Sequence, residues 1–115
     1  MKEIKRTFGN ITPAMQYNLV EGSPEKLSEK QEAFNCEAWV FFADGQTSDG
    51  KDKNVLSLLT TEGEALATNS ATFIDGFLTY WDMCEKAGVS ADQITVKVDT
   101  GLTKGGRTFI RCKAC

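Results

Sequence analysis

The chain has 115 residues, of which 41% are apolar and 25% are charged, and its formal net charge is −3. This length predicts one domain, residues 1–115, with a hydrophobic core of its own. No apolar run approaches the roughly 20 residues of a membrane-spanning helix, so we expect no membrane contact. The N-terminal residues lack the apolar segment of a secretory signal, which predicts a cytoplasmic protein.

The sequence contains no histidine, which is the commonest general base and a common metal ligand. It also contains no Walker loop, no G-x-G-x-x-G motif and no nucleophile–base pair. We therefore expect a protein that is not an enzyme and that uses no cofactor. Cys112 and Cys115 form a C-x-x-C motif, but the other two cysteines, Cys36 and Cys84, are predicted on core faces, so we expect no metal.

Residues 3–8 and 15–22 are predicted to form the first strands, and the polar residues 21–32 a loop or a brief helical turn. Residues 33–42 form a clearer strand whose side chains alternate between two faces. The face predicted to be core carries Phe34, Cys36, Ala38, Val40 and Phe42. The opposite face carries Asn35, Glu37, Trp39 and Phe41. Two large aromatic side chains are unusual on a face that meets only water.

The second half of the chain begins with a long loop, residues 43–54, which contains two Asp-Gly turn signals. Strands are predicted at 55–61 and 65–68, with a tight turn between them. A helix follows, for which Asn69, Ser70 and Thr72 are candidate N-caps and Gly88 marks the end. Its apolar side consists of Phe73, Ile74, Phe77, Leu78, Trp81 and Cys84. Residues 94–98 and 108–112 are predicted to form the last two strands.

This order of elements predicts a mainly β protein with one α-helix. A single helix with one apolar side is expected to close the open part of a curled sheet. Five strands with a helix between the third and the fourth is the element order of an OB-fold. We therefore expect an OB-fold-like five-stranded barrel, because a ferredoxin-like fold would need a second strong helix.

Positive charge is concentrated near the C-terminus of this acidic chain. From residue 97 onward, one acid, Asp99, stands among the basic residues Lys97, Lys104, Arg107, Arg111 and Lys113. Lys104 and Arg107 flank a Gly-Gly step at the tip of the predicted hairpin. If Thr108, Ile110 and Cys112 face the core, Phe109 and Arg111 share the outer face.

Binding of single-stranded nucleic acid requires cations that follow the phosphates and flat side chains on which bases stack. The C-terminal hairpin offers both, so its predicted DNA-binding residues are Lys97, Lys104, Arg107, Phe109 and Arg111. The alternative interpretation is a solvated hairpin tip whose glycines only permit the turn, with Phe109 in the core.

Trp39 and Phe41 are two further candidates for base stacking, because both lie on the second face of the 33–42 strand. The alternative is that the N-terminal segment or a dimer partner covers them. The loop at 43–54 contributes Lys51 and Lys53, but they alternate with aspartates, which predicts a weak phosphate contact there.

The stretches VLSLLTTEGEALATNSATFIDGFL (55–78) and ITVKVDTGLTKGGRTFIR (94–111) resemble the small single-stranded-DNA-binding proteins of protein-primed tailed phages. The first stretch matches as strand, glycine turn, strand and helix, and the second as a hairpin with a Lys-Gly loop and an aromatic. Residues 37–54 match as a strand with an aromatic and a long polar loop. The resemblance implies a DNA-replication role, and a location in the host cytoplasm if a phage encodes the chain.

The sequence therefore predicts a sequence-independent single-stranded-DNA-binding protein that protects DNA during phage-type replication. A second copy in a homo-oligomer and replication proteins are further candidate partners. The alternative function is an acidic protein-binding module that inhibits a host DNA-acting complex by imitating a nucleic-acid backbone. The cations near the C-terminus favour the first function, because a pure mimic has no use for them.

Overall fold

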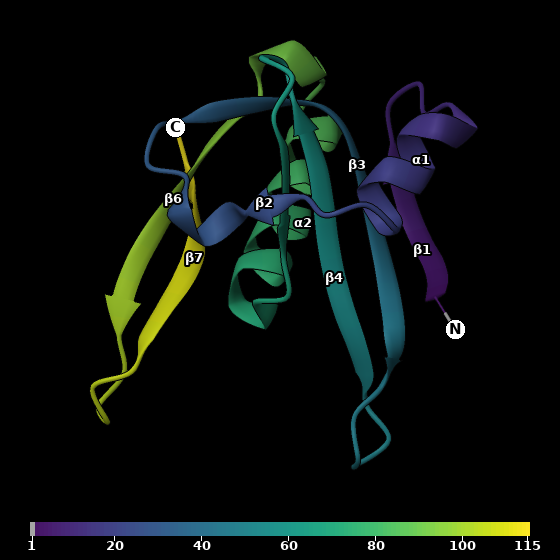
Figure 1. Cartoon of the computed structure of the whole chain (residues 1–115). Helices are drawn as coiled ribbons and strands as arrows, with labels where there is room; N and C mark the ends of the chain where they lie inside the picture. The colour runs from purple at the N-terminus through teal and green to yellow at the C-terminus, as the bar shows by residue number, and fades with distance from the viewer. Residues whose placement is uncertain (1) are drawn as a thin grey trace.

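The computed structural model describes residues 2–115 (Figure 1). Its two α-helices are α1 (Pro13–Val20) and α2 (Ala71–Lys86), and short 3₁₀ turns lie at Leu27–Glu29 and Ala91–Gln93. The strands are β1 (Lys2–Phe8), β2 (Glu25–Lys26), β3 (Phe34–Gln46), β4 (Asp52–Thr60), β5 (Ala65–Thr68), β6 (Thr95–Leu102) and β7 (Thr108–Ala114). In this part of the chain, neither helix is long and apolar enough to cross a membrane.

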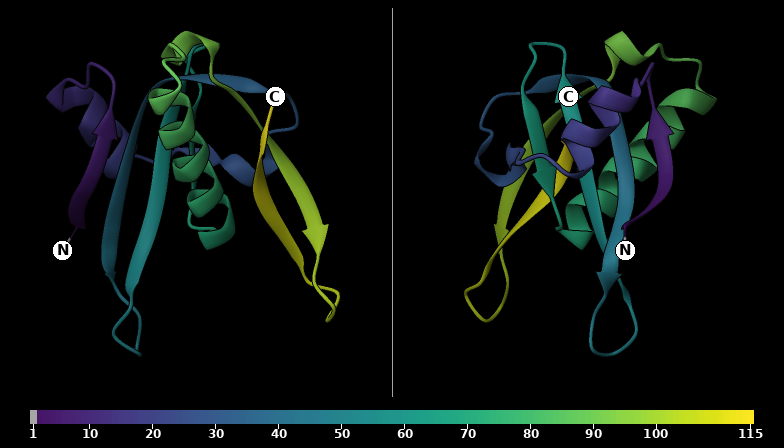
Figure 2. Two further views of the ribbon diagram at one scale, coloured as in Figure 1. Left: turned by 180° about the vertical axis from the view of Figure 1, so that it is seen from behind. Right: turned by 45° about the vertical axis from the view of Figure 1, so that its right-hand side comes forward.

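All the strands belong to one curled sheet in the order β2-β5-β4-β3-β6-β7, with β1 paired to β3 as well. The long strand β3 organises this sheet, because three strands pair with it. β4 follows it from Cys36 to Gln46, β1 pairs with its later part, and β6 pairs with its first two residues, Phe34 and Asn35. The sheet therefore forms a half-barrel, and α2 lies in its open side (Figure 2).

Helix α2 confirms the prediction made from its apolar pattern. The Ser70 hydroxyl accepts a hydrogen bond from the Phe73 N–H (3.2 Å) and so caps the helix start. At the other end Gly88 has φ +76°, and the Val89 N–H donates to the Cys84 carbonyl (2.9 Å), which ends the helix in a Schellman motif. Its buried side chains are Phe73, Ile74, Phe77, Trp81 and Cys84.

The predicted faces of β3 are wrong, because both faces of this strand are buried. A bulge at Glu37 places two β3 residues opposite one residue of β4, and the alternation of side chains reverses there. Trp39 therefore joins Phe34 and Cys36 in the core under α2, with none of its surface exposed. Val40 and Phe42 face the other way and, with Leu19 of α1, form a second core cluster.

In the N-terminal third, the strand predicted at 3–8 and a brief helical turn within 21–32 are present, and the other predictions differ from the structure. Residues 15–22 are not a strand, because Thr12 caps a helix there by accepting a hydrogen bond from the Met15 N–H (3.2 Å), and Pro13 follows as its first residue. The polar segment 21–32 contains β2 and a 3₁₀ turn in which Leu27 is completely buried. The predicted loop 43–54 is shorter in the structure, since β3 extends to Gln46 and β4 begins at Asp52.

The fold class is thus mainly β with a curled, barrel-like sheet, as predicted. The predicted numbers of strands and helices are wrong, because residues 2–115 contain seven strands and two α-helices instead of five strands and one helix. Helix α2 follows the fifth strand of the chain. The strand predicted at 3–8 is present as β1, and the elements that differ from the prediction, α1 and β2, both precede β3.

Trp39→Ala is expected to lower the free energy of unfolding by about 3–5 kcal/mol, because it leaves a large cavity between β3 and α2. Urea denaturation followed by circular dichroism measures this change. Tyr17→Ala provides the control, since this large side chain is 65% exposed and its loss is expected to have little effect. Equal effects of the two substitutions would contradict the placement of Trp39.

Candidate functional site

Three hairpin turns of the protein share one geometry and one sequence pattern, T-x-x-G-x. They are Thr47–Lys51, Thr60–Glu64 and Thr103–Arg107. In each turn the threonine N–H donates to the carbonyl of the fifth residue (2.7, 2.8 and 2.9 Å), and the glycine N–H donates to the threonine carbonyl (3.0 Å). The threonine hydroxyl accepts from the N–H of the fifth residue. Each glycine has a positive φ (+82°, +91° and +80°), a conformation that favours glycine.

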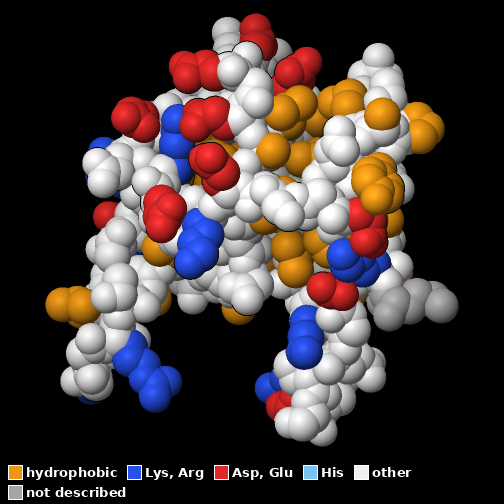
Figure 3. Space-filling model, viewed as in Figure 1, with side chains coloured by type: hydrophobic (Ala, Val, Ile, Leu, Met, Phe, Trp, Pro, Cys, Tyr) orange, Lys and Arg blue, Asp and Glu red, His pale blue; other side chains and the backbone are white. Residues whose placement is uncertain are grey.

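Two of these turns project from the same end of the molecule (Figure 1). They are the tips of the β3–β4 hairpin and of the β6–β7 hairpin, and a notch separates them in the space-filling view (Figure 3). Basic side chains appear on both projecting hairpins, whereas acidic side chains gather at the opposite end (Figure 3). The third turn, between β4 and β5, ends in Glu64 and lies at that acidic end.

The β6–β7 hairpin has a buried inner face and a charged outer face. Val96, Val98 and Ile110 are buried on the inner face, and Cys112 is half-buried there. The outer face carries three cross-strand pairs, Gly101 with Phe109, Asp99 with Arg111, and Lys97 with Lys113. Phe109 and Arg111 therefore share the outer face, as the sequence predicted.

Phe109 lies across the neighbouring strand on Gly101. A Cβ atom on Gly101 would lie 2.5 Å from the Phe109 Cζ, so any side chain at this position would displace the ring. The ring is half-buried, and the Arg111 guanidinium carbon lies 5.9 Å from its centroid. The outer face thus offers a flat aromatic surface with a cation beside it.

The cations of this hairpin form a line along its outer face and tip, which we call the cationic row: Lys104, Arg107, Arg111, Lys97 and Lys113. Arg111 is bound to Asp99 (Nε to Oδ2, 2.6 Å), and this hydrogen bond holds the pKa of the Asp99 carboxyl below its usual range. The other four side chains of the cationic row form no ion pair with any residue in the described part of the chain. Most of the positive charge is therefore open to a ligand.

The β3–β4 hairpin differs from the β6–β7 hairpin in its charge. Asp52 binds the ammonium of Lys5 (2.8 Å), which lowers the pKa of the Asp52 carboxyl. Asp49 accepts a hydrogen bond from the Thr47 hydroxyl, which also lowers the carboxyl pKa. The carboxylates stay ionised and offset Lys51 and Lys53. The described residues include no group of three or more acidic or cysteine side chains arranged to hold a metal ion.

Trp39 and Phe41 do not join the other predicted site residues. Trp39 has no exposed surface, and its ring contacts Phe77 and Trp81 edge to face (centroids 5.7 and 5.6 Å apart). Phe41 is half-buried, with the Lys5 ammonium 5.6 Å from its ring centroid. Helix α2 buries Trp39 from one side and Arg6 of β1 lies over its ring, so Trp39 is not available to a base and its predicted stacking role is wrong. The sequence carries no visible signal of the bulge that decides this. The N-terminal segment also reaches Phe41 through Lys5, and the role of Phe41 in stacking stays a prediction.

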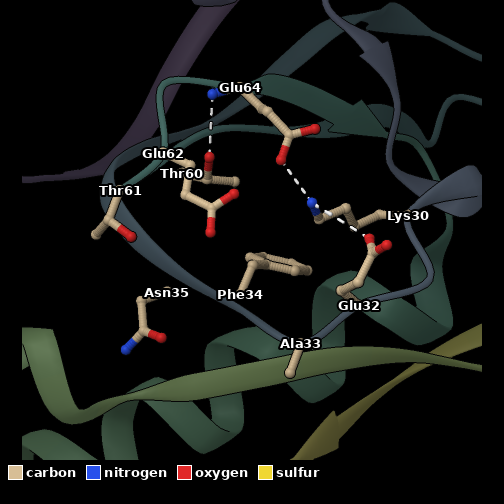
Figure 4. Close-up of a pocket in the computed structure, with 9 residues that line it drawn as sticks. All are labelled: Lys30, Glu32, Ala33, Phe34, Asn35, Thr60, Thr61, Glu62 and Glu64. Carbon is tan, nitrogen blue, oxygen red and sulfur yellow. Dashed lines mark hydrogen bonds and ion pairs between the residues drawn. The ribbon is translucent and has the colours of Figure 1, made fainter.

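The acidic end contains a cavity of about 510 Å³ that the sequence did not predict (Figure 4). The Lys30 ammonium lies between the carboxylates of Glu64 (2.5 Å) and Glu32 (3.6 Å), and the hydrogen bond that Lys30 donates to Glu64 raises the pKa of Lys30. Glu62 lines the same cavity and is exposed. This end of the molecule is suited to a basic ligand and is unsuited to a phosphate.

Two of the four cysteines, Cys36 and Cys112, have unreactive thiols. Burial raises the pKa of the Cys36 and Cys112 thiols to about 12. A thiol with such a pKa stays protonated at neutral pH, and it is then a weak nucleophile and a weak metal ligand. Cys84 is buried and Cys115 is exposed at the chain end.

Comparisons with protein-family models, with curated proteins and with solved structures found no match for this chain. Its distinctive surface is the cationic row with Phe109, on a hairpin whose tip projects into solvent.

Proposed function

We propose that the protein binds single-stranded DNA, without sequence preference, along the outer face of the β6–β7 hairpin. The observation that carries this proposal is the order of side chains on that face. Lys104 and Arg107 lie at the tip, Phe109 follows, and Arg111 and the Lys97–Lys113 pair lie beyond it. Successive pairs on one face of a strand are about 6.8 Å apart, so cations flank the ring on both sides at regular intervals.

This arrangement suits a single strand better than a duplex. A base can stack on Phe109 only when it is unpaired, and every base has a π face, so stacking imposes little sequence preference. The cations contact the phosphates, which are the same in every sequence. The net charge of −3 disfavours indiscriminate binding over the rest of the surface.

We also propose that the five strands from β3 onward form an OB-like barrel, to which β1, α1 and β2 are added. In this subset α2 lies between the third and fourth strands, and the first strand, β3, pairs with both the second and the fourth. OB-folds bind oligonucleotides with the loops between strands 1 and 2 and between strands 4 and 5. The corresponding loops here are the two projecting tips, 47–51 and 103–107. This correspondence of the two loops supports the proposed binding site. It also supports the resemblance of the chain to the single-stranded-DNA-binding proteins of phages.

The second candidate function uses the other end of the molecule. The carboxylates of Glu32, Glu62 and Glu64 around the cavity favour an acidic module that binds a basic protein and inhibits a DNA-acting complex. The two functions separate experimentally, because neutralising these glutamates would abolish the second function and leave DNA binding intact.

Oligothymidine is expected to bind more weakly as salt rises, with a slope of about −0.7 in log K against log salt per phosphate contact. A duplex of equal length is expected to compete poorly. The anisotropy of a labelled oligonucleotide is the suitable readout, because Trp39 and Trp81 are both buried and give little direct quenching. Equal affinity for single and double strands would contradict the proposed site.

Replacing Lys104 and Arg107 together by Ala is expected to weaken binding to all base compositions alike and to flatten the salt slope by up to about 1.4. The free energy of unfolding should change by less than about 0.5 kcal/mol, because both side chains are exposed. Lys26→Ala with Lys86→Ala is the matched control, since these exposed lysines lie on β2 and α2. A control that loses as much affinity would argue against a local contact.

Phe109→Leu is expected to weaken binding by about 1–3 kcal/mol, the contribution of one stacked base, while Phe109→Trp retains it. Gly101→Val should produce a similar loss without removing the ring, because the new side chain takes its place. Circular dichroism verifies that each variant folds. Full affinity in Phe109→Leu would show that no base stacks there.

A further inference from the structure

Lys97 and Lys113 lie directly opposite each other on the outer face of the β6–β7 hairpin. Both side chains are exposed, and within the described chain neither forms an ion pair. Like charges in this cross-strand position destabilise a sheet. The free protein thus carries a cross-strand pair whose like charges repel each other.

One carboxylate stands beside this pair. Asp99 lies two residues from Lys97 on the same face of β6. Its cross-strand neighbour is Arg111, to which it is bound, and Arg111 lies two residues from Lys113 on β7. The charges of Arg111 and Lys113 both help to lower the pKa of the Asp99 carboxyl. One anion therefore faces three cations, and this corner of the hairpin keeps an uncompensated positive charge.

We infer that the Lys97–Lys113 pair binds one phosphodiester of the DNA strand whose base stacks on Phe109. This inference rests on the proposed function and assigns a phosphate subsite within it. The Lys97–Lys113 pair is the second cross-strand pair along the outer face from the Gly101–Phe109 pair, at a distance of about 14 Å. The subsite therefore takes the phosphate of a neighbouring nucleotide, and not that of the stacked one.

Asp99 limits the affinity of this subsite. Its carboxylate belongs to the neighbouring cross-strand pair of the outer face, and it repels a phosphate that approaches the two lysines. Its hydrogen bond uses only the Arg111 Nε, and within the described residues the terminal guanidinium nitrogens form no hydrogen bond. Arg111 can therefore contact the same strand while Asp99 holds it.

This arrangement predicts opposite effects on stability and on binding. Lys113→Gln removes the like-charge pair, so the midpoint of thermal unfolding at low salt should rise by about 1–4 °C. The same variant should bind oligothymidine about fivefold more weakly, with the salt slope reduced by about 0.7. Lys26→Gln is the matched control, because it makes the same change in net charge at an exposed lysine of β2. Its unfolding midpoint and its affinity for oligothymidine should both stay close to wild type.

Asp99→Asn provides the second arm of the experiment. The amide oxygen still accepts the hydrogen bond from Arg111, but the negative charge is removed, so affinity for oligothymidine should rise about threefold. Glu62→Gln changes the net charge equally at the acidic end and should leave the affinity unchanged. Weaker binding by Asp99→Asn would overturn the role given to Asp99.

The outcomes separate this inference from the proposed function. If the wild-type protein binds oligothymidine and Lys113→Gln binds it equally well, the phosphate subsite is wrong and the proposed function stands. A lower unfolding midpoint in Lys113→Gln would equally overturn the subsite, since the pair would then stabilise the free protein. If the wild-type protein does not bind, the proposed function fails and the subsite fails with it.

Discussion

The packing of Trp39 against Phe77 and Trp81 is the interaction on which the rest of the structure depends. It fixes α2 in the open side of the curled sheet, so that the start of the helix lies beside the β6–β7 hairpin. There the Ser70 hydroxyl donates to the Ile110 carbonyl of β7 (3.3 Å). Gly76 of α2 faces β7, since a Cβ atom there would lie 3.4 Å from the Cys112 Cβ, in van der Waals contact. The direction of the β6–β7 hairpin, and of the cationic row, follows from this core.

Local signals explain which parts of the fold could be predicted from the sequence. Ser70, Gly88 and the apolar stripe between them specify α2 without reference to the rest of the chain, and the Thr103–Arg107 turn specifies its hairpin in the same way. The bulge at Glu37 depends on the pairing of β3 with β4, so the sequence alone placed Trp39 on the wrong face. The helix start at Thr12 and Pro13 was a readable local signal, and it outweighs the strand-like residues that follow. The shared outer face of Phe109 and Arg111 was predictable, because it depends only on the local alternation along β7. The burial of Trp39 was not, because it depends on how β3 pairs with its neighbours.

The electrostatic character of the molecule comes from how its charges are paired. Lys2, Lys5, Arg6 and Lys30 all form ion pairs with carboxylates. Arg6 binds Asp82 and Glu85 of α2 while its guanidinium carbon lies 5.3 Å from the Trp39 ring centroid, so one side chain covers the core and neutralises the helix surface. The β6–β7 hairpin has a single carboxylate to pair with its five cations. A protein with a negative total charge thereby presents a positive surface at one place.

The T-x-x-G-x turns separate the shape of a hairpin tip from its charge. Threonine and glycine make the backbone contacts at all three tips, and the other three positions take no part through their side chains in this shared pattern. The fifth position is Lys51, Glu64 or Arg107 with the same hydrogen bonds. The tips that end in Lys51 and Arg107 can therefore exchange one charge for another in a single substitution without a change of loop conformation, whereas Glu64 also binds Lys30. Descendants of such a chain could acquire a different partner at one tip while the other two, and the core beneath them, stay as they are.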